Sequence, residues 1–139
     1  VDSRWQLARA WRLDLAWSGK EAEFREGPYS GNAIPLVPTT RWTAMLSYDG
    51  GMLGNHALLA NHVGERRFGG DEANLRDKLP AYTTLDWQSR WQLARWELAL
   101  RIANLTDRKH ATLAYDYGYG ASYYPANPRA GYVTARYRF

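Results

Sequence analysis

Apolar and polar side chains alternate with a period of two through most of this 139-residue sequence. Within residues 96–103, tryptophan, leucine or isoleucine occupies every even position, while Glu97 and Arg101 take odd positions. A helix would scatter the large apolar side chains around its axis, whereas a β-strand places them on one face. The alternation recurs in residues 1–8, 12–18, 41–48, 84–93 and 132–139, and more weakly in residues 55–67. We therefore expect an all-β chain of about seven strands.

The connections between these strands are alternately short and long. Short breaks are expected near residues 9–11, 49–54 and 94–95, and long connections at residues 25–38, 68–80 and 105–128. Tight turns join neighbouring antiparallel strands, so the pattern predicts an antiparallel meander with all its short turns at one end. Outer-membrane barrels have this arrangement, with short periplasmic turns and longer extracellular loops.

The strand positions that alternate with the large apolar residues hold charged residues such as Arg12, Asp86 and Arg136. A soluble sheet would turn this face to solvent, and its apolar face would need a second layer. No helix is expected to supply that layer, and the longest apolar run, residues 57–60, excludes a transmembrane helix of about 20 residues. In a membrane barrel, lipid covers the apolar face and the lumen accepts the charges. A soluble sandwich of the seven strands remains an alternative.

Aromatic residues make up 14% of the chain and gather near the short turns. Those at or next to the short-turn end are Trp11, Tyr48, Trp91, Trp96, Tyr137 and Phe139. Barrels carry aromatic girdles at the membrane interfaces, whereas a soluble sandwich would spread its rings through its core. We predict that Trp11, Tyr48, Trp91, Trp96 and Tyr137 belong to a membrane girdle.

Composition excludes several classes of function. The net charge is only +4 and the basic residues are scattered, which argues against binding to nucleic acid. The absence of cysteine excludes disulfides, thiolate metal sites and a cysteine nucleophile. The sequence starts at Val1 without a signal-like segment, so we expect either a cytosolic protein or a mature or truncated piece of a longer chain.

No catalytic set or metal site is expected. His56 and His62 share a strand face but lie about 20 Å apart along the strand, too far to share a metal. Asp71, Glu72 and Asn74 could bind a cation, although a polar loop fixed by its own hydrogen bonds is the favoured interpretation. We therefore predict neither an enzyme nor a bound cofactor.

The last long connection is the best candidate for ligand contact. It concentrates tyrosines between glycines, which offer amphipathic contact area at low entropic cost. The candidate residues are Tyr115, Tyr117, Tyr119, Tyr123, Tyr124 and, just beyond, Arg129. Packing between loops at a barrel rim is the alternative role for each tyrosine.

Several short motifs occur in a characteristic order. They are Ile34-Pro35-Leu36-Val37-Pro38 with Arg41, Gly69-Gly70-Asp71-Glu72-Ala73-Asn74, Leu79-Pro80-Ala81-Tyr82-Thr83-Thr84-Leu85-Asp86, Ile102-Ala103-Asn104-Leu105-Thr106-Asp107, Tyr123-Tyr124-Pro125 with Pro128-Arg129, and the ending Arg136-Tyr137-Arg138-Phe139. Through them the chain resembles the C-terminal barrel portion of TonB-dependent outer-membrane receptors over nearly its full length. Thr106 departs from the resemblance, since the family often has Phe there.

The resemblance implies that residues 1–139 form about the last seven strands of a 22-stranded transmembrane barrel. It implies a plug domain and earlier strands outside this sequence, and a location in the outer membrane of a Gram-negative bacterium. The implied activity is TonB-dependent uptake of a scarce solute such as a ferric siderophore or similar metal complex. The implied partners are outer-membrane lipid, the chelate, and TonB through the missing plug region.

The C-terminal residues Val133, Ala135, Tyr137 and Phe139 share one strand face and end on an aromatic ring. They resemble the signal by which the barrel assembly machinery recognises outer-membrane barrels. Two other functions stay open from the sequence. One is a soluble β-sandwich that binds carbohydrate through its tryptophans, and the other is a small complete outer-membrane barrel with a structural or enzymatic role. An odd strand count argues against the small barrel.

Overall fold

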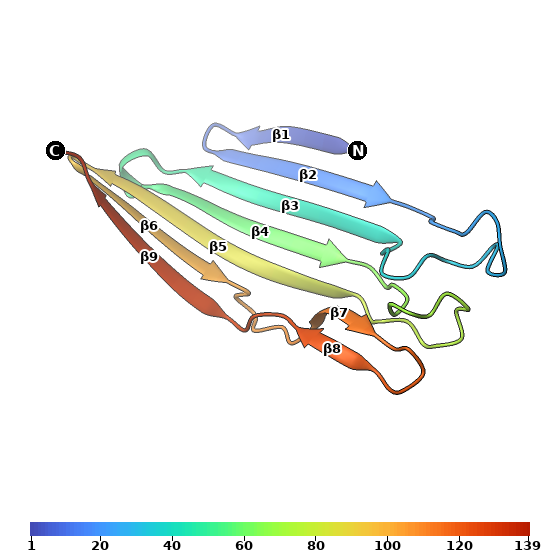
Figure 1. Cartoon of the computed structure of the whole chain (residues 1–139). Helices are drawn as coiled ribbons and strands as arrows, with labels where there is room; N and C mark the ends of the chain where they lie inside the picture. The colour runs from blue at the N-terminus through green and yellow to red at the C-terminus, as the bar shows by residue number, and fades with distance from the viewer.

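The computed structural model describes all of residues 1–139 and consists almost entirely of β-strands (Figure 1). The strands of the main sheet are β1 (Asp2–Ala8), β2 (Trp11–Gly19), β3 (Thr40–Asp49), β4 (Asn55–Val63), β5 (Tyr82–Leu93), β6 (Trp96–Ala103) and β9 (Ala130–Tyr137). They form one antiparallel sheet of seven strands in the order β1-β2-β3-β4-β5-β6-β9. The all-β meander predicted from the alternating residues is therefore confirmed. No helix is long and apolar enough to cross a membrane.

Two features of the secondary structure differ from the prediction. The expected strand at residues 55–67 ends at Val63, so the segment after it joins the following long connection. The long connection at residues 105–128 contains a hairpin of two short strands, β7 (Ala111–Tyr115) and β8 (Ser122–Pro125). This hairpin forms a sheet of its own and is skipped by the main sheet, because β6 pairs directly with β9.

All short turns lie at one end of the sheet and all long connections at the other (Figure 1). The short-turn end holds the β1–β2 turn, the β3–β4 turn with the 3-10 segment η1 (Gly51–Leu53), and the β5–β6 turn. The long-loop end holds residues 20–39, 64–81 and 104–129. This is the arrangement predicted from the spacing of the turn residues.

The strand register keeps the two kinds of side chain on opposite faces. One row of paired residues crosses the sheet through Trp5, Leu13, Leu46, Leu58, Trp87 and Ile102. A neighbouring row crosses it through Gln6, Arg12, Ser47, Ala57, Gln88, Arg101 and Tyr132. Because side chains alternate along each strand, the first row belongs to an apolar face and the second to a polar face.

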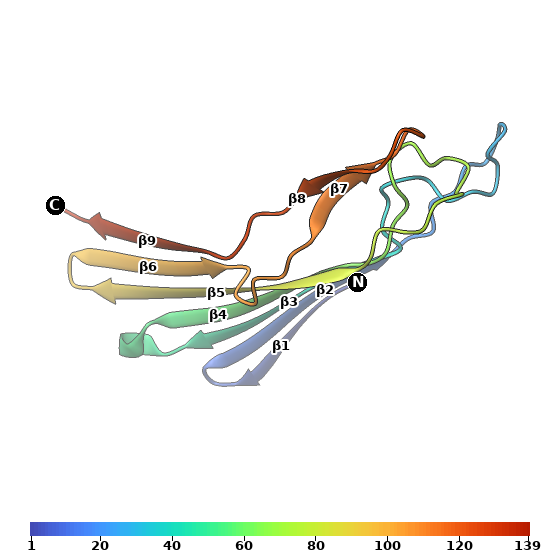
Figure 2. The same cartoon turned by 90° about the horizontal axis from the view of Figure 1, so that it is seen from below.

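The polar face is the concave one. The sheet bends from β1 to β9 (Figure 2), and a hollow of about 780 Å³ opens mainly between residues of the polar face, including Arg12, Gln88 and Arg101. A second hollow of about 420 Å³ lies beside Arg4 and Asp14 on the same face. The apolar face is accordingly the convex one, as in the wall of a barrel with a wet lumen.

The main sheet has no apolar core of its own. The buried apolar side chains are those of Phe68, Leu79 and Ala114, all outside the seven strands of the main sheet. On the apolar face, Trp17, Leu58 and Val133 are exposed, and nothing in the chain packs over them. The sandwich alternative is wrong because all seven strands lie in a single sheet rather than in two packed layers.

Candidate functional site

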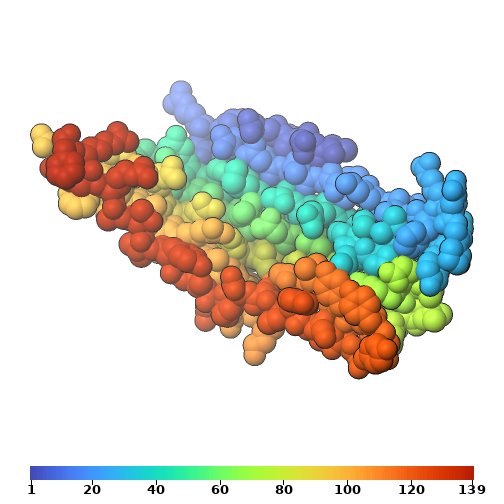
Figure 3. Space-filling model, in the orientation of Figure 1, coloured from blue at the N-terminus to red at the C-terminus, as the bar shows by residue number.

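The three long connections, residues 20–39, 64–81 and 104–129, pack together at one end of the sheet, and we refer to them as the loop cluster. Figure 3 shows the blue-to-cyan, yellow-green and orange segments in contact at this end. Most of the 12 buried residues of the chain belong to this cluster. The cluster is therefore the best-packed part of the molecule.

Asn74 joins the first two connections. Its side-chain oxygen accepts a hydrogen bond from the Ala33 amide and its side-chain nitrogen donates to the Ala33 carbonyl, each at 2.9 Å. Asn32 strengthens the junction by donating to the Glu72 carbonyl at 2.9 Å. Asn74 adopts a left-handed backbone conformation, with φ of 56°, which asparagine tolerates better than most residues. One side chain thus ties segments about 40 residues apart in sequence.

The β7–β8 hairpin is anchored on the connection between β4 and β5. The Gly69 amide donates to the Ala114 carbonyl and the Asp116 amide donates to the Gly69 carbonyl, both at 2.9 Å. A Cβ at Gly69 would lie 2.3 Å from the ring of Tyr115, so only glycine allows the hairpin to approach this closely. Phe68, Leu79 and Ala114 form a small apolar core beneath it.

Two arginines supply the charged part of this anchor. Arg76 pairs with Asp116 at 3.2 Å, and the Asp116 side chain is only 5% exposed. Arg66 donates to the carbonyls of Ala111 and Thr112, each at 2.8 Å, and its burial lowers the pKa of its guanidinium. Arg66 also lies over the ring of Tyr82, 5.5 Å from its centroid. Both guanidinium groups therefore hold the hairpin against the loop before it.

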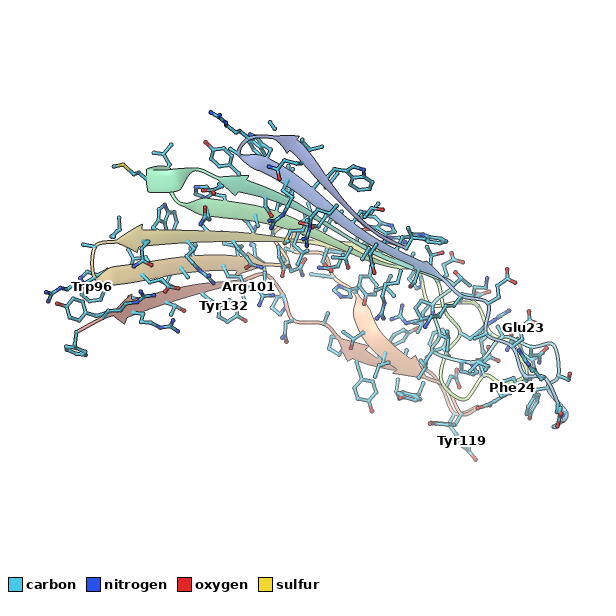
Figure 4. All side chains as sticks on the ribbon, turned by 90° about the horizontal axis from the view of Figure 1, so that it is seen from above. Glu23, Phe24, Trp96, Arg101, Tyr119 and Tyr132 are labelled. Atoms are coloured by element: carbon cyan, nitrogen blue, oxygen red, sulfur yellow. The ribbon has the colours of Figure 1, made fainter.

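The tyrosines predicted to contact ligand lie on and around this hairpin. Tyr115 stacks on Tyr117 with ring centroids 6.0 Å apart and meets Tyr124 edge to face at 5.9 Å. Tyr123 packs on the other side against Phe68, at 5.8 Å. Tyr119 is fully exposed at the hairpin tip, where Figure 4 places it at the same end of the molecule as Glu23 and Phe24.

Arg129 does not join the tyrosines. It lies at the root of the last connection, where its amide donates to Asp107 at 2.9 Å and its guanidinium approaches the Leu105 carbonyl at 3.5 Å. The structure therefore brings together Tyr115, Tyr117 and Tyr124, and it separates Arg129 from them. Whether any of these residues touches a ligand stays a prediction.

The acidic segment predicted as a polar loop is fixed by its own hydrogen bonds. One oxygen of the Asp71 carboxylate accepts from the Leu75 amide at 2.8 Å, and the other accepts from the Arg76 amide at 3.3 Å. The structure brings together no group of three or more histidine or acidic side chains that could hold a metal ion. The interpretation as a self-bonded loop is confirmed.

The residues predicted to form a girdle lie at the short-turn end on the apolar face. Trp11 contacts Tyr48 with ring centroids 4.7 Å apart, and Trp96 contacts Tyr137 at 5.0 Å. His56, which the predicted girdle did not include, lies between Tyr48, with ring centroids 6.1 Å apart, and Trp91, at 5.8 Å. Its even-numbered position in β4, on the same face as Leu58, would have been enough to predict this place.

A second aromatic row, also missed, lies on the apolar face near the long-loop end. Trp17 pairs with Trp42 in the β2–β3 register, and Trp42 stacks on His62 with ring centroids 5.2 Å apart. The two rows are separated by the aliphatic part of the face, around Leu46 and Leu58. The role of either row at a membrane interface stays a prediction.

The proposed assembly residues lie along the edge strand β9. Val133, Ala135 and Tyr137 pair with Leu100, Leu98 and Trp96 on the apolar face. Phe139 follows the strand, is fully exposed, and meets the ring of Tyr137 edge to face at 5.2 Å. Their recognition by an assembly machinery stays a prediction.

Residues 1–105 match the family model described as TonB dependent receptor-like, beta-barrel. The search of curated proteins finds no match. Among solved structures, the ferric yersiniabactin uptake receptor FyuA from Yersinia pestis is similar at 26% identity with a TM-score of 0.81, over 99% of this chain and 22% of that chain.

Two further solved structures share the fold. The siderophore receptor PiuA from Acinetobacter baumannii is 23% identical with a TM-score of 0.73, over 95% of this chain and 20% of that one. The copper transporter OprC is 18% identical with a TM-score of 0.77, over 98% of this chain and 23% of that one. The chain thus spans only about a fifth of the length of these proteins. Because the family model covers most of the sequence, this chain belongs to the TonB-dependent receptor β-barrel family.

Proposed function

We propose that this chain forms part of the wall and outer loops of an outer-membrane receptor that imports a scarce solute by TonB-dependent uptake. The family match over residues 1–105 carries the proposal. The solute would be a ferric siderophore or a similar metal complex. The similarity to FyuA and PiuA supports a siderophore complex as the solute, while the similarity to the copper transporter OprC widens the possible solutes to complexes of other metals.

The geometry of the sheet is consistent with this role. Lipid would cover the convex apolar face, and the polar concave face would line the lumen. The open edges at β1 and β9 would need further strands, since unpaired backbone groups are costly in lipid. In this arrangement the long-loop end faces outward from a Gram-negative cell and the short-turn end faces the periplasm.

The other partners belong to the same proposal. TonB would act through a plug region outside these 139 residues. The barrel assembly machinery would recognise β9 through Tyr137 and Phe139. We assign the chain no catalytic role, since the similar proteins are receptors and transporters.

The loop cluster is the proposed point of solute capture. The exposed rings of Tyr117, Tyr119 and Tyr124 stand on a hairpin held by buried hydrogen bonds, so little ordering cost would accompany contact with a solute. The full-length receptor should confer TonB-dependent uptake of iron supplied as a siderophore complex on iron-starved cells. Uptake that persists without TonB, or that is the same without the receptor, would contradict the proposal.

A triple variant, Tyr117→Ala with Tyr119→Ala and Tyr124→Ala, should weaken solute binding to whole cells by about tenfold or more, as loss of buried aromatic anchors does. Met52→Ala is the control, since Met52 is also exposed but lies at the short-turn end. Equal solute binding by the triple variant and the control would show that these tyrosines are not part of the capture site.

A further inference from the structure

Three arginines surround one carboxylate on the concave wall near the short-turn end. Glu97 of β6 faces Arg90 of β5 at 3.6 Å, and Arg136 and Arg138 of the last segment at 3.8 Å each. Glu97 pairs with Arg136 in the β6–β9 register, and Arg90, Glu97 and Arg136 occupy polar-face positions of their strands. We call Arg90, Arg136 and Arg138 the arginine cluster.

Within these 139 residues, the charges in this cluster do not balance. Three guanidinium groups share a single carboxylate, which leaves an excess of two positive charges. The other acidic residues of the wall are matched more closely, since Asp86 accepts from Arg101 at 2.8 Å and Asp14 is held by Arg4 and Arg12. The arginine cluster is therefore the place on this wall where the largest number of arginines share one carboxylate.

The guanidinium groups also retain free donors. Their distances to Glu97, 3.6–3.8 Å, exceed the range of a direct hydrogen bond. Their side chains are 66–68% exposed, whereas that of Glu97 is 18% exposed. A guanidinium has five N–H donors in a planar fork that matches the two oxygens of a carboxylate. The cluster can therefore accept a second carboxylate beside Glu97 without first breaking strong bonds.

Space for such a group lies beside Arg90, the member of the cluster that lines the hollow of about 780 Å³. The hollow is also lined by Arg12, Arg101 and neutral polar side chains such as Gln88 and Thr134. This volume falls in the range of pockets for small organic ligands. Asp49, the acidic residue on its rim, accepts a hydrogen bond from the Gly51 amide.

We infer that Arg90, Arg136 and Arg138 form a carboxylate-binding site on the lumen wall. The inference rests on the proposed function because it takes the concave face as the wall of a lumen. The carboxylate comes either from a transported solute or from an acidic side chain of the receptor polypeptide inside the barrel. Both sources offer the same chemistry to the three arginines.

The test uses the full-length receptor in phospholipid vesicles, with ferric citrate as the carboxylate probe. The variants are the triple change Arg90→Gln, Arg136→Gln and Arg138→Gln, the single change Glu97→Gln, and the control Arg41→Gln. Arg41 is an exposed arginine of the same polar face, in β3 at the long-loop end of the sheet and away from the cluster. Two quantities are measured for each protein: the midpoint temperature of unfolding without probe, and the dissociation constant for ferric citrate.

If the carboxylate belongs to a transported solute, the triple variant should bind ferric citrate about tenfold or more weakly, which is the loss typical of charge-assisted hydrogen bonds. Glu97→Gln should bind it more tightly, because it removes the competing carboxylate. If the carboxylate instead belongs to the receptor itself, the triple variant should unfold at a lower temperature without probe. Glu97→Gln should then unfold at a higher temperature.

The inference is overturned if the triple variant matches Arg41→Gln in both quantities. It is also overturned if Glu97→Gln and the triple variant both lose stability, since a purely structural ion-pair network would behave in that way. Neither measurement requires TonB or transport, so failure of the arginine site is distinguishable from failure of uptake by cells.

Discussion

The sheet and the loop cluster of this chain are built on opposite principles. The sheet leaves large apolar side chains such as Trp17 and Leu58 uncovered, although it is the most regular part of the molecule. The loop cluster has little regular structure, yet it contains the small apolar core of Phe68, Leu79 and Ala114 and buried charged residues. In a soluble domain the regular elements would normally carry the core.

The difference is the one expected if the two regions face different solvents, as the proposed function requires. An uncovered apolar face is stable when lipid covers it, and it then needs no second layer. Loops surrounded by water must bury their own apolar groups and pair their own charges, as Arg76 and Asp116 do. In the proposed receptor, lipid would be the packing partner of the sheet, whereas the loops pack against their own side chains.

The largest expected effect separates the two faces of β4. Ala60→Arg places a charge on the apolar face near the middle of the strand, opposite Ala44 and Leu85. It should lower the free energy of unfolding of the full-length receptor in lipid by about 2–4 kcal/mol. Ala57→Arg on the polar face borders the hollow and should change it by less than about 1 kcal/mol. Equal costs for the two variants would contradict the assignment of faces.

A smaller effect is expected at the contact between hairpin and loop. Gly69→Ala brings a Cβ to 2.3 Å from the Tyr115 ring, so the hairpin must shift, at a cost of about 1–3 kcal/mol. Hydrogen exchange should accelerate in β7 and β8 while the main sheet keeps its protection. Gly131→Ala on β9 is the control, because a Cβ there meets nothing within 4 Å. Exchange that accelerates throughout the sheet would mean that the two regions are not separate units.

The smallest expected loss of stability comes from breaking either of two ion pairs in the loop cluster, one buried and one exposed. Arg76→Met leaves the buried carboxylate of Asp116 without its partner and should destabilise the hairpin by about 1–2 kcal/mol. Lys78→Met breaks the exposed pair with Glu65, at 3.9 Å, and should cost under about 1 kcal/mol. Limited proteolysis of the hairpin would rank the variants. Faster cleavage of Lys78→Met would show that burial does not decide the strength of these pairs.

The strands and their faces could be predicted from the sequence because a period of two is a local pattern. The rows through Leu46 and Arg101 needed only the order of residues within each strand, and the glycines and prolines located the turns. Even the weak strand β4 was placed by its apolar residues, although its end at Val63 was not. The histidines of β4 could have been assigned to the aromatic rows by the same parity.

The packing of the loop cluster could not be predicted in this way. Its contacts join segments far apart in sequence, such as Asn74 with Ala33 and Arg76 with Asp116. No local pattern specifies which carbonyl an arginine or asparagine will reach. The β7–β8 hairpin did leave a signal, since short runs around Leu113 and Tyr123 flank the glycines between them.

The most direct test of the account measures which solvent each residue of β3 contacts. The chain contains no cysteine, so single cysteines from Thr43 to Ser47 can carry spin labels within the membrane-embedded full-length receptor. Labels at Ala44 and Leu46 should collide with oxygen dissolved in lipid, while labels at Thr43, Met45 and Ser47 should collide less with it. Oxygen collision rates that do not alternate, or that alternate with the opposite parity, would contradict the claim that lipid covers the apolar face.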